Sequence, residues 1–355
     1  MNQFSSRIDA ADLHHIWVQA NSCLNALDKA RLFITGGTGF FGSWLLESLL
    51  FAEEQLGVNI DVVVLTRSPQ DFIKKAPNLA RMKQLAFHTG DVTTFDYPAG
   101  DFTHVIHAAT EASAALNAEQ PFLMLDTILK GTERVLDFAV QAKVKKFLFT
   151  SSGAIYGVQP PSYSHIEESF HGAPDPLLPN TSYGIGKRTA EHLCSLYASS
   201  YGLDIKIARC FAFVGPYLPL SIHFAIGNFI QSALQKKPII IKGDGTPYRS
   251  YLYAADLVYW LWMILCHGQQ NRAYNVGSEE AISVADLASL VASQSAEPLP
   301  IDMAQKPNPS FLPSRYVPST KRAREELGLK QHIDLKTSIK KTMDWSYNDE
   351  QTKSQ

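Results

Sequence analysis

Residues 31–50 read RLFITGGTGFFGSWLLESLL and combine three local patterns. A short apolar run, LFIT, leads into a turn in which Gly36, Gly39 and Gly42 recur at G-x-x-G-x-x-G spacing, and a strongly helical segment follows. Glycine permits the tight turn and lets backbone N–H groups approach a pyrophosphate at the helix N-terminus. Such a turn indicates a nucleotide-binding site when it follows a strand and precedes a helix. We therefore expect residues 31–50 to open a nucleotide-binding unit.

Short apolar runs alternate with helical segments along the first half of the chain. Residues 117–142 predict a helix, and strands are predicted by VVVL (62–65), LAFHTGDV (85–92), THVIHAAT (103–110) and KKFLFTSS (145–152). Continuous apolar strands between helices are typical of a parallel sheet that is covered on both faces. Because ligands bind at the carboxyl ends of such strands, the ends of these runs would line one crevice.

The composition excludes several classes of protein. The chain has 355 residues, of which 45% are apolar and 19% charged, which suits a globular protein with two lobes or domains. A net charge of −2 argues against a nucleic-acid surface or a polybasic membrane patch. The N-terminus lacks a signal-peptide pattern, and the most apolar stretch, LVYWLWMILC (257–266), is about half the length of a membrane span. We expect a cytoplasmic protein without nucleic-acid or membrane partners.

The cysteines and histidines do not form a recognisable pattern. Cys23, Cys194, Cys210 and Cys266 are scattered, with no C-x-x-C spacing. This distribution argues against a disulfide scaffold and against a zinc site, and it fits a reducing compartment. The histidines are equally scattered, so we expect no metal site.

A tyrosine and a lysine stand four residues apart in SYGIGKRTAEHL, residues 182–193. They are Tyr183 and Lys187, at the front of a predicted helix, where positions i and i+4 share one face. A nearby ammonium favours the phenolate and lowers a tyrosine pKa from its reference of about 10. The tyrosine can then act as an acid or base near neutral pH. Because this spacing is common by chance, its meaning depends on the other motifs.

Five motifs, TGGTGFFG, GDV, HAAT, SSGAIYG and YGIGK, occur in the order and approximate spacing of the extended short-chain dehydrogenase/reductase family. The chain resembles this family of nucleotide-sugar epimerases, dehydratases, decarboxylases and reductases over roughly residues 31–345. The resemblance implies an α/β fold, with a doubly wound parallel (Rossmann) sheet and a smaller C-terminal α/β substrate-binding lobe. It implies that Tyr183 is the catalytic acid/base, that Lys187 lowers its pKa and binds the nicotinamide ribose, and that Ser152 hydrogen-bonds the reacting oxygen.

The same comparison suggests how the chain is divided. Residues 1–30 are expected to form an N-terminal helical extension, and residues 31–215 a dinucleotide-binding Rossmann domain that also takes a return strand from about 250–280. Residues 216–345 would form mainly the substrate-binding lobe, and residues 346–355 a tail. The strand–helix alternation loosens from about residue 155, which agrees with a change from cofactor to substrate binding.

The resemblance assigns a set of residues to the cofactor. Many NAD-binding members end the second strand in an acid that binds the adenosine ribose, whereas Thr66 and Arg67 stand here. Arg67 could pair with a 2′-phosphate, or it could stack on adenine or be solvated. We expect NADP(H) in preference to NAD(H), with Asp91 binding the adenine amino group. The cofactor residues are Gly36, Gly39, Phe40, Phe41, Gly42, Arg67, Asp91, Val92, Ala108, Ala109 and Lys187.

A nucleotide-sugar substrate is implied in the same way. Arg249 would clamp its diphosphate, because a forked guanidinium suits phosphate geometry. Relatives often carry an Asn where Ala212 stands, so one diphosphate contact is in doubt. Tyr156 is expected either to be structural or to line the substrate. The substrate residues are Thr110, Tyr156, His223, Asn228 and Arg249.

Two positions that carry acid–base residues in some family members hold residues without an acid–base group in this chain. Family dehydratases carry Asp and Glu just before the Val-Tyr-Gly of this strand end, and decarboxylases keep a Glu, whereas Gly153 and Ala154 stand here. Without a carboxylate at either position, β-elimination lacks its acid and base. What remains is Ser152, Tyr183, Lys187 and a nicotinamide, a set that interconverts an alcohol and a ketone.

We therefore expect an NAD(P)-dependent oxidoreductase that acts on C4 of a nucleotide-linked sugar, and first of all a 4-ketoreductase. A C4-epimerase with tightly bound NAD is the alternative. A 4,6-dehydratase, in which Glu111 or His223 replaces the missing groups, and a non-catalytic NADP(H)-sensing protein rank below both. By resemblance the protein is a homodimer that packs through the helix at 117–142 and the helix that begins near Tyr183. The apolar residues available for that contact are Phe122, Leu125, Leu129, Leu193, Leu196 and Tyr197.

Overall fold

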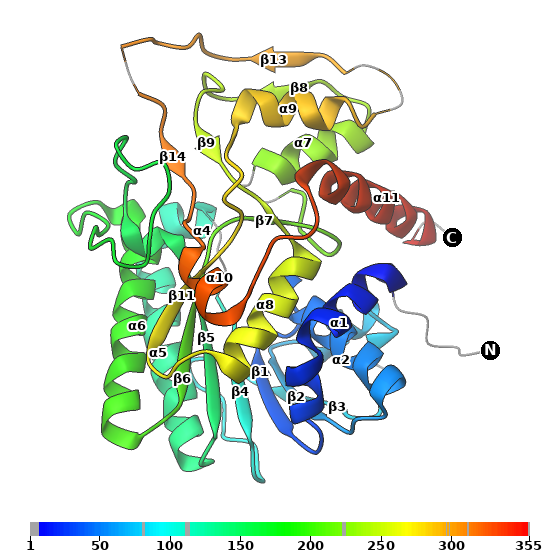
Figure 1. Cartoon of the computed structure of the whole chain (residues 1–355), viewed down its shortest axis with the longest axis vertical. Helices are drawn as coiled ribbons and strands as arrows, with labels where there is room; N and C mark the ends of the chain where they lie inside the picture. Colours follow the sequence, from blue (N-terminus) through cyan, green and yellow to red (C-terminus); the bar gives the residue numbers. More distant parts are fainter. Residues whose placement is uncertain are drawn as a thin grey trace.

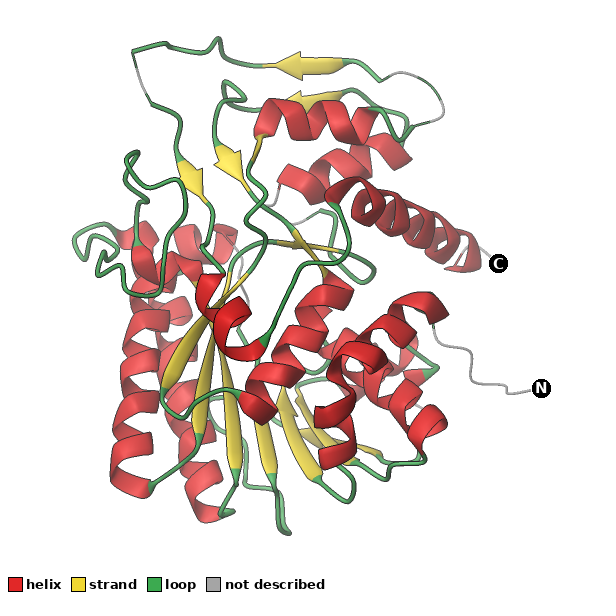
Figure 2. Ribbon diagram, viewed as in Figure 1, coloured by secondary structure: helices red, strands yellow, loops and turns green. Residues whose placement is uncertain are grey.

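A computed structural model gives the fold of residues 7–79, 82–110, 114–221, 225–295, 297, 299–310 and 312–353. Figure 1 shows a larger unit built around a sheet, with a smaller lobe at its upper end. Figure 2 shows that helices cover both faces of the sheet.

The large sheet is parallel throughout. Its strand order is β11-β6-β5-β4-β1-β2-β3. The chain runs outward from β1 to β3 and then returns to the other side of β1 with β4, so the order reverses between β1 and β4, where doubly wound sheets bind their ligands. The predicted fold class is confirmed. The strands are β1 (Arg31–Thr35), β2 (Asp61–Thr66), β3 (Leu85–Thr89), β4 (His104–His107), β5 (Lys146–Ser152), β6 (Ile205–Cys210) and β11 (Arg272–Val276).

Two helical layers cover this sheet, one on each face. Because successive residues of a strand face opposite sides, each strand contributes side chains to both layers. Leu32 and Ile34 of β1 belong to the hydrophobic core under one layer, and Phe33 belongs to the core under the other. This explains why the strands are apolar without interruption. The first layer contains α1 (Ala10–Ala26), α2 (Phe40–Leu56), α3 (Pro69–Lys75) and α8 (Ala254–His267). The second contains α4 (Ala114–Glu119), α5 (Pro121–Gln141) and α6 (Ser182–Tyr201).

The helix predicted over residues 117–142 is interrupted in the structure. It consists of α4 and α5, which are separated at Gln120, where the backbone is not helical (φ −135°, ψ 60°). Pro121 causes this break, since its ring disfavours helical geometry in the preceding residue and suits the first position of a new helix. The prediction of one continuous helix was therefore wrong at this point.

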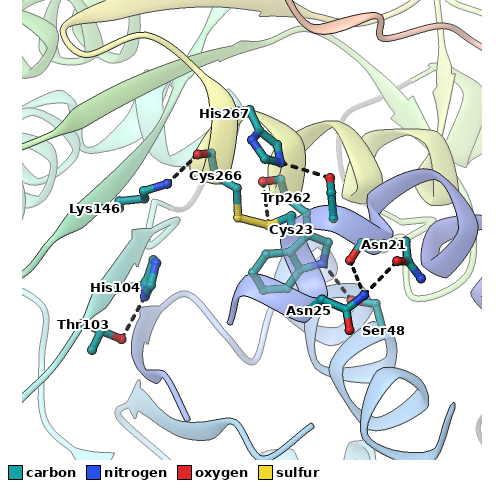
Figure 3. The surroundings of a disulfide bond; sticks show 11 residues. Asn21, Cys23, Asn25, Ser48, Thr103, His104, Lys146, Trp262, Cys266 and His267 are labelled. Atoms are coloured by element: carbon teal, nitrogen blue, oxygen red, sulfur yellow. Dashed lines mark hydrogen bonds between the residues drawn. A yellow bond between two sulfur atoms is a disulfide. The ribbon is translucent and has the colours of Figure 1, made fainter. Parts of the chain in front are cut away.

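The N-terminal helix α1 packs on α8 and α2. The buried carboxylate of Asp12 accepts a hydrogen bond from the Tyr253 hydroxyl at 2.7 Å and pairs with Lys341 at 2.9 Å. Figure 3 shows that a disulfide joins Cys23 of α1 to Cys266 of α8, with 5.6 Å between the Cα atoms. The scattered cysteines argued against disulfide bonding, and this cross-link corrects that expectation. The two residues are 243 positions apart, so no local spacing could reveal the pair.

The smaller lobe consists of short elements that are far apart in sequence. A three-stranded sheet has the order β12-β9-β14, and two further pairs are β10-β7 and β13-β8. Its strands are β7 (Phe213–Val214), β8 (Ile239–Ile241), β9 (Tyr248–Arg249), β10 (Leu252–Tyr253), β12 (Ile282–Ser283), β13 (Ile301–Met303) and β14 (Arg315–Tyr316). Its helices are α7 (Ala225–Leu234), α9 (Val284–Ala292) and α11 (Leu335–Lys353). Helix α10 (Lys321–Leu327) lies back on the larger unit, against β11 and α8 (Figure 1).

The most apolar stretch, residues 257–266, lies within α8. This helix has 14 residues and is almost entirely buried, as the sequence predicted. Within the described part of the chain, no helix combines the length and the apolar character that a bilayer crossing requires.

Candidate active site

The glycine-rich turn lies against the end of β4 and leaves no room for side chains. A Cβ on Gly36 would lie 2.5 Å from the carbonyl oxygen of Ala108, and φ is +73° at this residue. A Cβ on Gly42 would lie 2.3 Å from the backbone of Gly37. Helix α2 begins directly after the turn, and no side chain caps its first N–H groups. A cradle that any Cβ would fill, beside an uncapped helix N-terminus, fits the pyrophosphate of a dinucleotide.

The apolar residues assigned to the cofactor lie at the start of α2 and after strands β3 and β4. Phe40 and Phe41 open α2, Val92 follows β3, and Ala108 and Ala109 follow β4. All five are half-buried, as residues that line a crevice at the strand ends would be.

The end of β2 carries no carboxylate. Thr66 is buried and its hydroxyl accepts a hydrogen bond from the backbone N–H of Ser68 at 3.3 Å, while Arg67 is exposed. Hydrogen bonds from the hydroxyl and N–H of Thr93, at 2.6 and 2.9 Å, lower the pKa of Asp91, and the positive charge of Arg67 lowers it further. Arg67 and Asp91 therefore lie close enough to interact electrostatically.

A second cation lies beside the glycine-rich turn. Lys75, at the end of α3, donates a hydrogen bond from Nζ to the carbonyl oxygen of Thr38 at 3.2 Å. The sequence analysis did not single out this residue, because nothing in the local pattern shows that α3 folds back onto the turn.

A buried histidine fixes the turn after β4. Nδ1 of His107 lies 2.7 Å from the hydroxyl of Thr35, which also accepts the N–H of Ala109 at 3.1 Å. Nε2 lies 3.1 Å from the hydroxyl of Thr132 on α5. Burial, helped by the charge of Lys187, lowers the pKa of His107 to about 3, so the ring is neutral. The Thr35 hydroxyl can thus donate to Nδ1 while Nε2–H donates to Thr132.

Ser152 and Tyr183, predicted as catalytic residues, come together at the end of β5. The Ser152 hydroxyl accepts the N–H of Ala154 at 3.1 Å and is near enough to the Tyr183 phenol to lower its pKa. The start of α6 is held by Asn117, whose Oδ1 accepts the N–H of Tyr183 at 2.9 Å. Burial raises the pKa of Tyr183 to about 12, and the Ser152 hydroxyl opposes this rise.

Lys187 is 2% exposed. Its ammonium donates hydrogen bonds to the carbonyl oxygen of Thr150 at 2.7 Å and to the hydroxyl of Thr110 at 2.9 Å, and it lies 4.8 Å from the ring centre of Phe149. Burial lowers the pKa of Lys187 to about 8. We expected this ammonium to lower the pKa of Tyr183; in the structure it is held by the ends of β4 and β5, and Ser152 has that effect instead.

Tyr156 belongs to a buried polar network. Its hydroxyl donates to Oδ1 of Asn275 at 2.7 Å and accepts from the Arg209 guanidinium at 2.9 Å. Of the two roles left open for Tyr156, these contacts support the structural one.

The remaining substrate candidates are only partly brought to the site. Arg249, on β9, is the register partner of Tyr316 on β14, and its charge lowers the pKa of Tyr316. Asn228, on α7, is half-buried. His223 and Glu111 lie outside the described residues.

Sequence reasoning missed Tyr316, on β14. Its ring packs on Phe211 with 4.7 Å between the centroids. Its hydroxyl would be 2.7 Å from a Cβ on Gly153, and Ser152 is near enough to lower its pKa. No sequence signal links a tyrosine so late in the chain to the end of β5.

The described residues contain no group of three or more His, Cys, Asp and Glu side chains that could hold a metal ion.

Comparison with known proteins agrees with this geometry. Residues 32–277 match the model of the NAD dependent epimerase/dehydratase family. UDP-glucuronic acid decarboxylase 6 of Arabidopsis thaliana is 29% identical over 312 residues, which covers 87% of this chain and 86% of the relative. UDP-glucuronic acid decarboxylase 1 of Danio rerio is 27% identical over 322 residues, covering 91% of this chain and 74% of the relative.

Solved structures share the fold. UDP-glucose 4-epimerase from Thermus thermophilus, in complex with NAD, superposes with a TM-score of 0.71 and 26% identity, covering 89% of this chain and 98% of that one. UDP-glucuronic acid 4-epimerase from Bacillus cereus gives a TM-score of 0.75 at 23% identity, covering 90% of this chain and 99% of that one. Since the family model spans well over half of its length, the chain belongs to the NAD dependent epimerase/dehydratase family and is an enzyme of the extended short-chain dehydrogenase/reductase type.

Proposed function

We propose that this enzyme interconverts an alcohol and a ketone at C4 of the sugar in a nucleotide-linked sugar. The observation that carries the proposal is the Ser152–Tyr183 pair at the end of β5, beside Gly153 and Ala154, which have no acid–base side chain. The choice of substrate class is supported by relatives whose names state UDP-linked sugars.

In this proposal Tyr183 holds the proton that is exchanged with the C4 oxygen, and Ser152 orients that oxygen by a hydrogen bond. A pKa of about 12 keeps Tyr183 protonated at neutral pH, which suits protonation of a ketone oxygen during reduction. When bound, the nicotinamide supplies or accepts the hydride, and its oxidised ring adds a positive charge that favours the phenolate. Lys187, held by Thr150 and Thr110, places an ammonium at the cofactor's edge of the site.

The arrangement does not support elimination of water. A dehydratase needs a base for the C5 proton and an acid for the departing hydroxyl. A side chain at Gly153 would collide with Tyr316 and Phe211, since its Cβ would lie 2.7 Å from atoms of both. Ala154 has a methyl group that cannot exchange a proton.

For the net reaction we propose reduction of a 4-keto sugar by NADPH. The support is the absence of a carboxylate at the end of β2, together with Arg67 and Lys75 near the adenosine end. A 2′-phosphate suits two such cations, and an exchangeable cofactor suits net reduction. The second candidate is a C4-epimerase with NAD held through the cycle. It is favoured by Asp91, whose negative charge lies near Arg67, and by an epimerase relative that binds NAD.

The two candidates can be separated by one set of measurements. The purified protein is denatured and the released cofactor identified; then NDP-4-keto-6-deoxyhexoses are supplied with NADPH or NADH, and NDP-hexoses without added cofactor. Consumption of NADPH with formation of a 4-hydroxy sugar supports the ketoreductase. Co-purified NAD with interconversion of C4 epimers supports the epimerase. Sustained formation of a 4-keto-6-deoxy sugar from an NDP-hexose would contradict both.

We also propose a homodimer and a cytoplasmic location. The homodimer is supported by apolar side chains that remain open on α5 and α6, where Phe122 is 86% and Leu196 is 47% exposed. The location rests on the sequence pattern alone, and the Cys23–Cys266 disulfide argues against it, because disulfides are rare in reducing compartments.

A further inference from the structure

The turn after β4 is held by a side chain at a point where its neighbours are held by backbone. The chain leaves β4 and continues to the site through residues 108–110. The N–H groups of Ala108 and Thr110 donate to the backbone carbonyls of Thr35 and Ala108, both at 3.1 Å. The N–H of Ala109 donates instead to the side-chain hydroxyl of Thr35, at 3.1 Å. The position of Ala109 therefore depends on the orientation of one hydroxyl.

His107 fixes the orientation of that hydroxyl. Thr35 and His107 are register partners on β1 and β4, so both side chains leave the sheet on the same face, which α5 covers. The Thr35 hydroxyl lies 2.7 Å from Nδ1, and Nε2 lies 3.1 Å from the hydroxyl of Thr132 on α5. A hydroxyl has one proton and two lone pairs, and the N–H of Ala109 takes one lone pair. Donation of the proton to Nδ1 satisfies both groups, and it requires the tautomer with its proton on Nε2.

The three polar side chains lie in an apolar layer between the sheet and α5. Thr35, His107 and Thr132 are at most 2% exposed, and the ring packs on Phe149 with 5.6 Å between the centroids. Burial, helped by the charge of Lys187, lowers the pKa of the ring, which stays neutral and able to accept at Nδ1. Buried polar groups cost free energy unless they are paired, and apolar side chains would fill this space without that cost. What the three polar side chains add is a fixed hydroxyl at the end of β1.

The turn held in this way forms one wall of the cofactor cradle. A Cβ on Gly36 would lie 2.5 Å from the carbonyl oxygen of Ala108 and 2.8 Å from the nitrogen of Ala109. Thr35 is the residue that enters the glycine-rich turn, so its hydroxyl links that turn to the one that packs against it. A displacement of Ala109 would change the space between the two turns, at the point where the strand order reverses.

We infer that His107 is a positioning residue for the dinucleotide cofactor: its neutral ring accepts the Thr35 proton and thereby holds the N–H of Ala109 and this wall of the cradle in place. The ring is buried behind the turn and acts through Thr35. This role depends on the cofactor cradle and not on the reaction proposed at C4.

Two amide side chains can each replace one half of the ring, which gives the test. Oδ1 of Asn is two bonds from Cβ, as Nδ1 of His is, and Nε2 of Gln is three bonds from Cβ, as Nε2 of His is. His107→Asn therefore keeps an acceptor for Thr35 and loses the bond to Thr132, whereas His107→Gln keeps a donor for Thr132 and loses the acceptor for Thr35.

Cofactor affinity is measured by fluorescence titration of each full-length variant with NADH and with NADPH. We expect His107→Gln to raise Kd roughly tenfold for both, because both contain the pyrophosphate and the cradle has lost the bond that fixes its wall. His107→Asn should stay within about twofold of the original protein. With an active substrate, the KM for the cofactor should rise by the same factor in His107→Gln while kcat at saturating cofactor stays nearly constant.

Hydrogen exchange of the Ala109 amide, followed by NMR, tests the contact without cofactor or substrate. Exchange should be faster in His107→Gln and in Thr35→Val, and close to the original rate in His107→Asn. Thr132→Val is the matched control, because it removes the other hydrogen bond of the ring from a buried position. It should leave Kd and the exchange of Ala109 unchanged even though urea unfolding shows a loss of stability.

Equal losses of cofactor affinity in His107→Asn and His107→Gln would overturn the inference, since the effect would then follow stability. Unchanged affinity in both variants, unchanged exchange of Ala109 in His107→Gln, or a loss for NADPH alone would also contradict it. Because neither measurement uses a sugar, a panel of nucleotide sugars without turnover would count only against the proposed function. If His107→Gln does not fold, Thr35→Val takes its place, and Thr35→Ser, which keeps the hydroxyl, should restore the affinity.

Discussion

At the scale of single residues, the proton on Tyr183 decides what the site can do. We expect Tyr183→Phe to reduce turnover by about 10²–10⁴-fold, since the group that carries the proton is lost. Cofactor affinity should change little, because the ring still packs at the start of α6. Measurements of turnover and of cofactor affinity on the same preparation check both expectations. Rates close to those of the original enzyme would remove Tyr183 from the mechanism.

A second residue-scale prediction concerns cofactor choice. If Arg67 and Lys75 pair with a 2′-phosphate, Arg67→Ala and Lys75→Ala should each weaken NADPH binding by roughly 10- to 100-fold, while NADH binding stays nearly constant. Lys74→Ala is the control, because Lys74 is an exposed neighbour on the same helix. Fluorescence titration with both cofactors makes the comparison. Equal losses of affinity for NADPH and NADH would show that the two cations do not bind the 2′-phosphate and would favour the epimerase.

The sequence predicts residues of this site when they belong to a compact motif. Ser152, Tyr183 and the glycines were predicted because each lies in a short pattern with fixed spacing, and in the structure Ser152 is near enough to Tyr183 to lower its pKa. Lys187 was predicted as a residue but not in its contacts, since its ammonium direction depends on Thr150 and Thr110, which come from other strands. Tyr316 could not be predicted, because it arrives by the pairing of two-residue strands.

At the scale of elements, the His107 network ties β1, β4 and α5 together through Thr35 and Thr132. The pKa of His107 is lowered to about 3, whereas an unfolded histidine has a pKa of about 6.5. Between these values the unfolded chain binds a proton that the folded chain does not, so stability is lost as the pH falls below about 6.5.

We therefore predict that lowering the pH from 7 to 5 reduces the free energy of unfolding by about 2 kcal/mol through this residue. Urea unfolding at both pH values measures the change. In His107→Asn the difference between the two pH values should shrink, whereas His192→Asn, at an exposed position of α6, should leave it as it is. The same pH dependence in His107→Asn would mean that other groups are responsible.

Helices and strands can be predicted from the sequence where a single pattern, such as an apolar run, determines them. The apolar strands and the buried α8 were predicted because parallel strands and core helices are apolar on all sides. The break between α4 and α5 was missed because the helical pattern continues through Pro121, although a proline disfavours helical geometry in the residue before it. The pairings of β8 with β13 and of β9 with β14 join distant two- or three-residue segments, too short for a periodic signal.

At the scale of the whole molecule, α5 and α6 lie side by side and leave apolar side chains open. We predict that the protein sediments as a dimer at micromolar concentration, and that Phe122→Asp and Leu196→Asp shift it towards monomer, because each would bury a charge in the contact. Leu312→Asp is the control, since Leu312 is 75% exposed but lies in the smaller lobe. A monomer in the unmodified protein would refute the dimer.

The sequence predicts little of how the two lobes are arranged. The doubly wound sheet could be predicted because its strands and helices alternate along the chain. The return strand expected from about 250–280 corresponds to β11 (Arg272–Val276), which pairs with β6 at the edge of that sheet. The pairing of β14, which carries Tyr316, with β9 joins segments with no shared pattern.

The bond between Cys23 and Cys266 gives the chain a covalent property that its fold alone would not have. Because these residues are 243 positions apart, the chain between them forms a closed ring that contains six of the seven strands of the large sheet, β1 to β6. A protease that cuts once anywhere in this ring produces two pieces that stay joined. On a denaturing gel the nicked protein would therefore run as a single species of undiminished mass, and the two fragments would separate only after a thiol reductant is added.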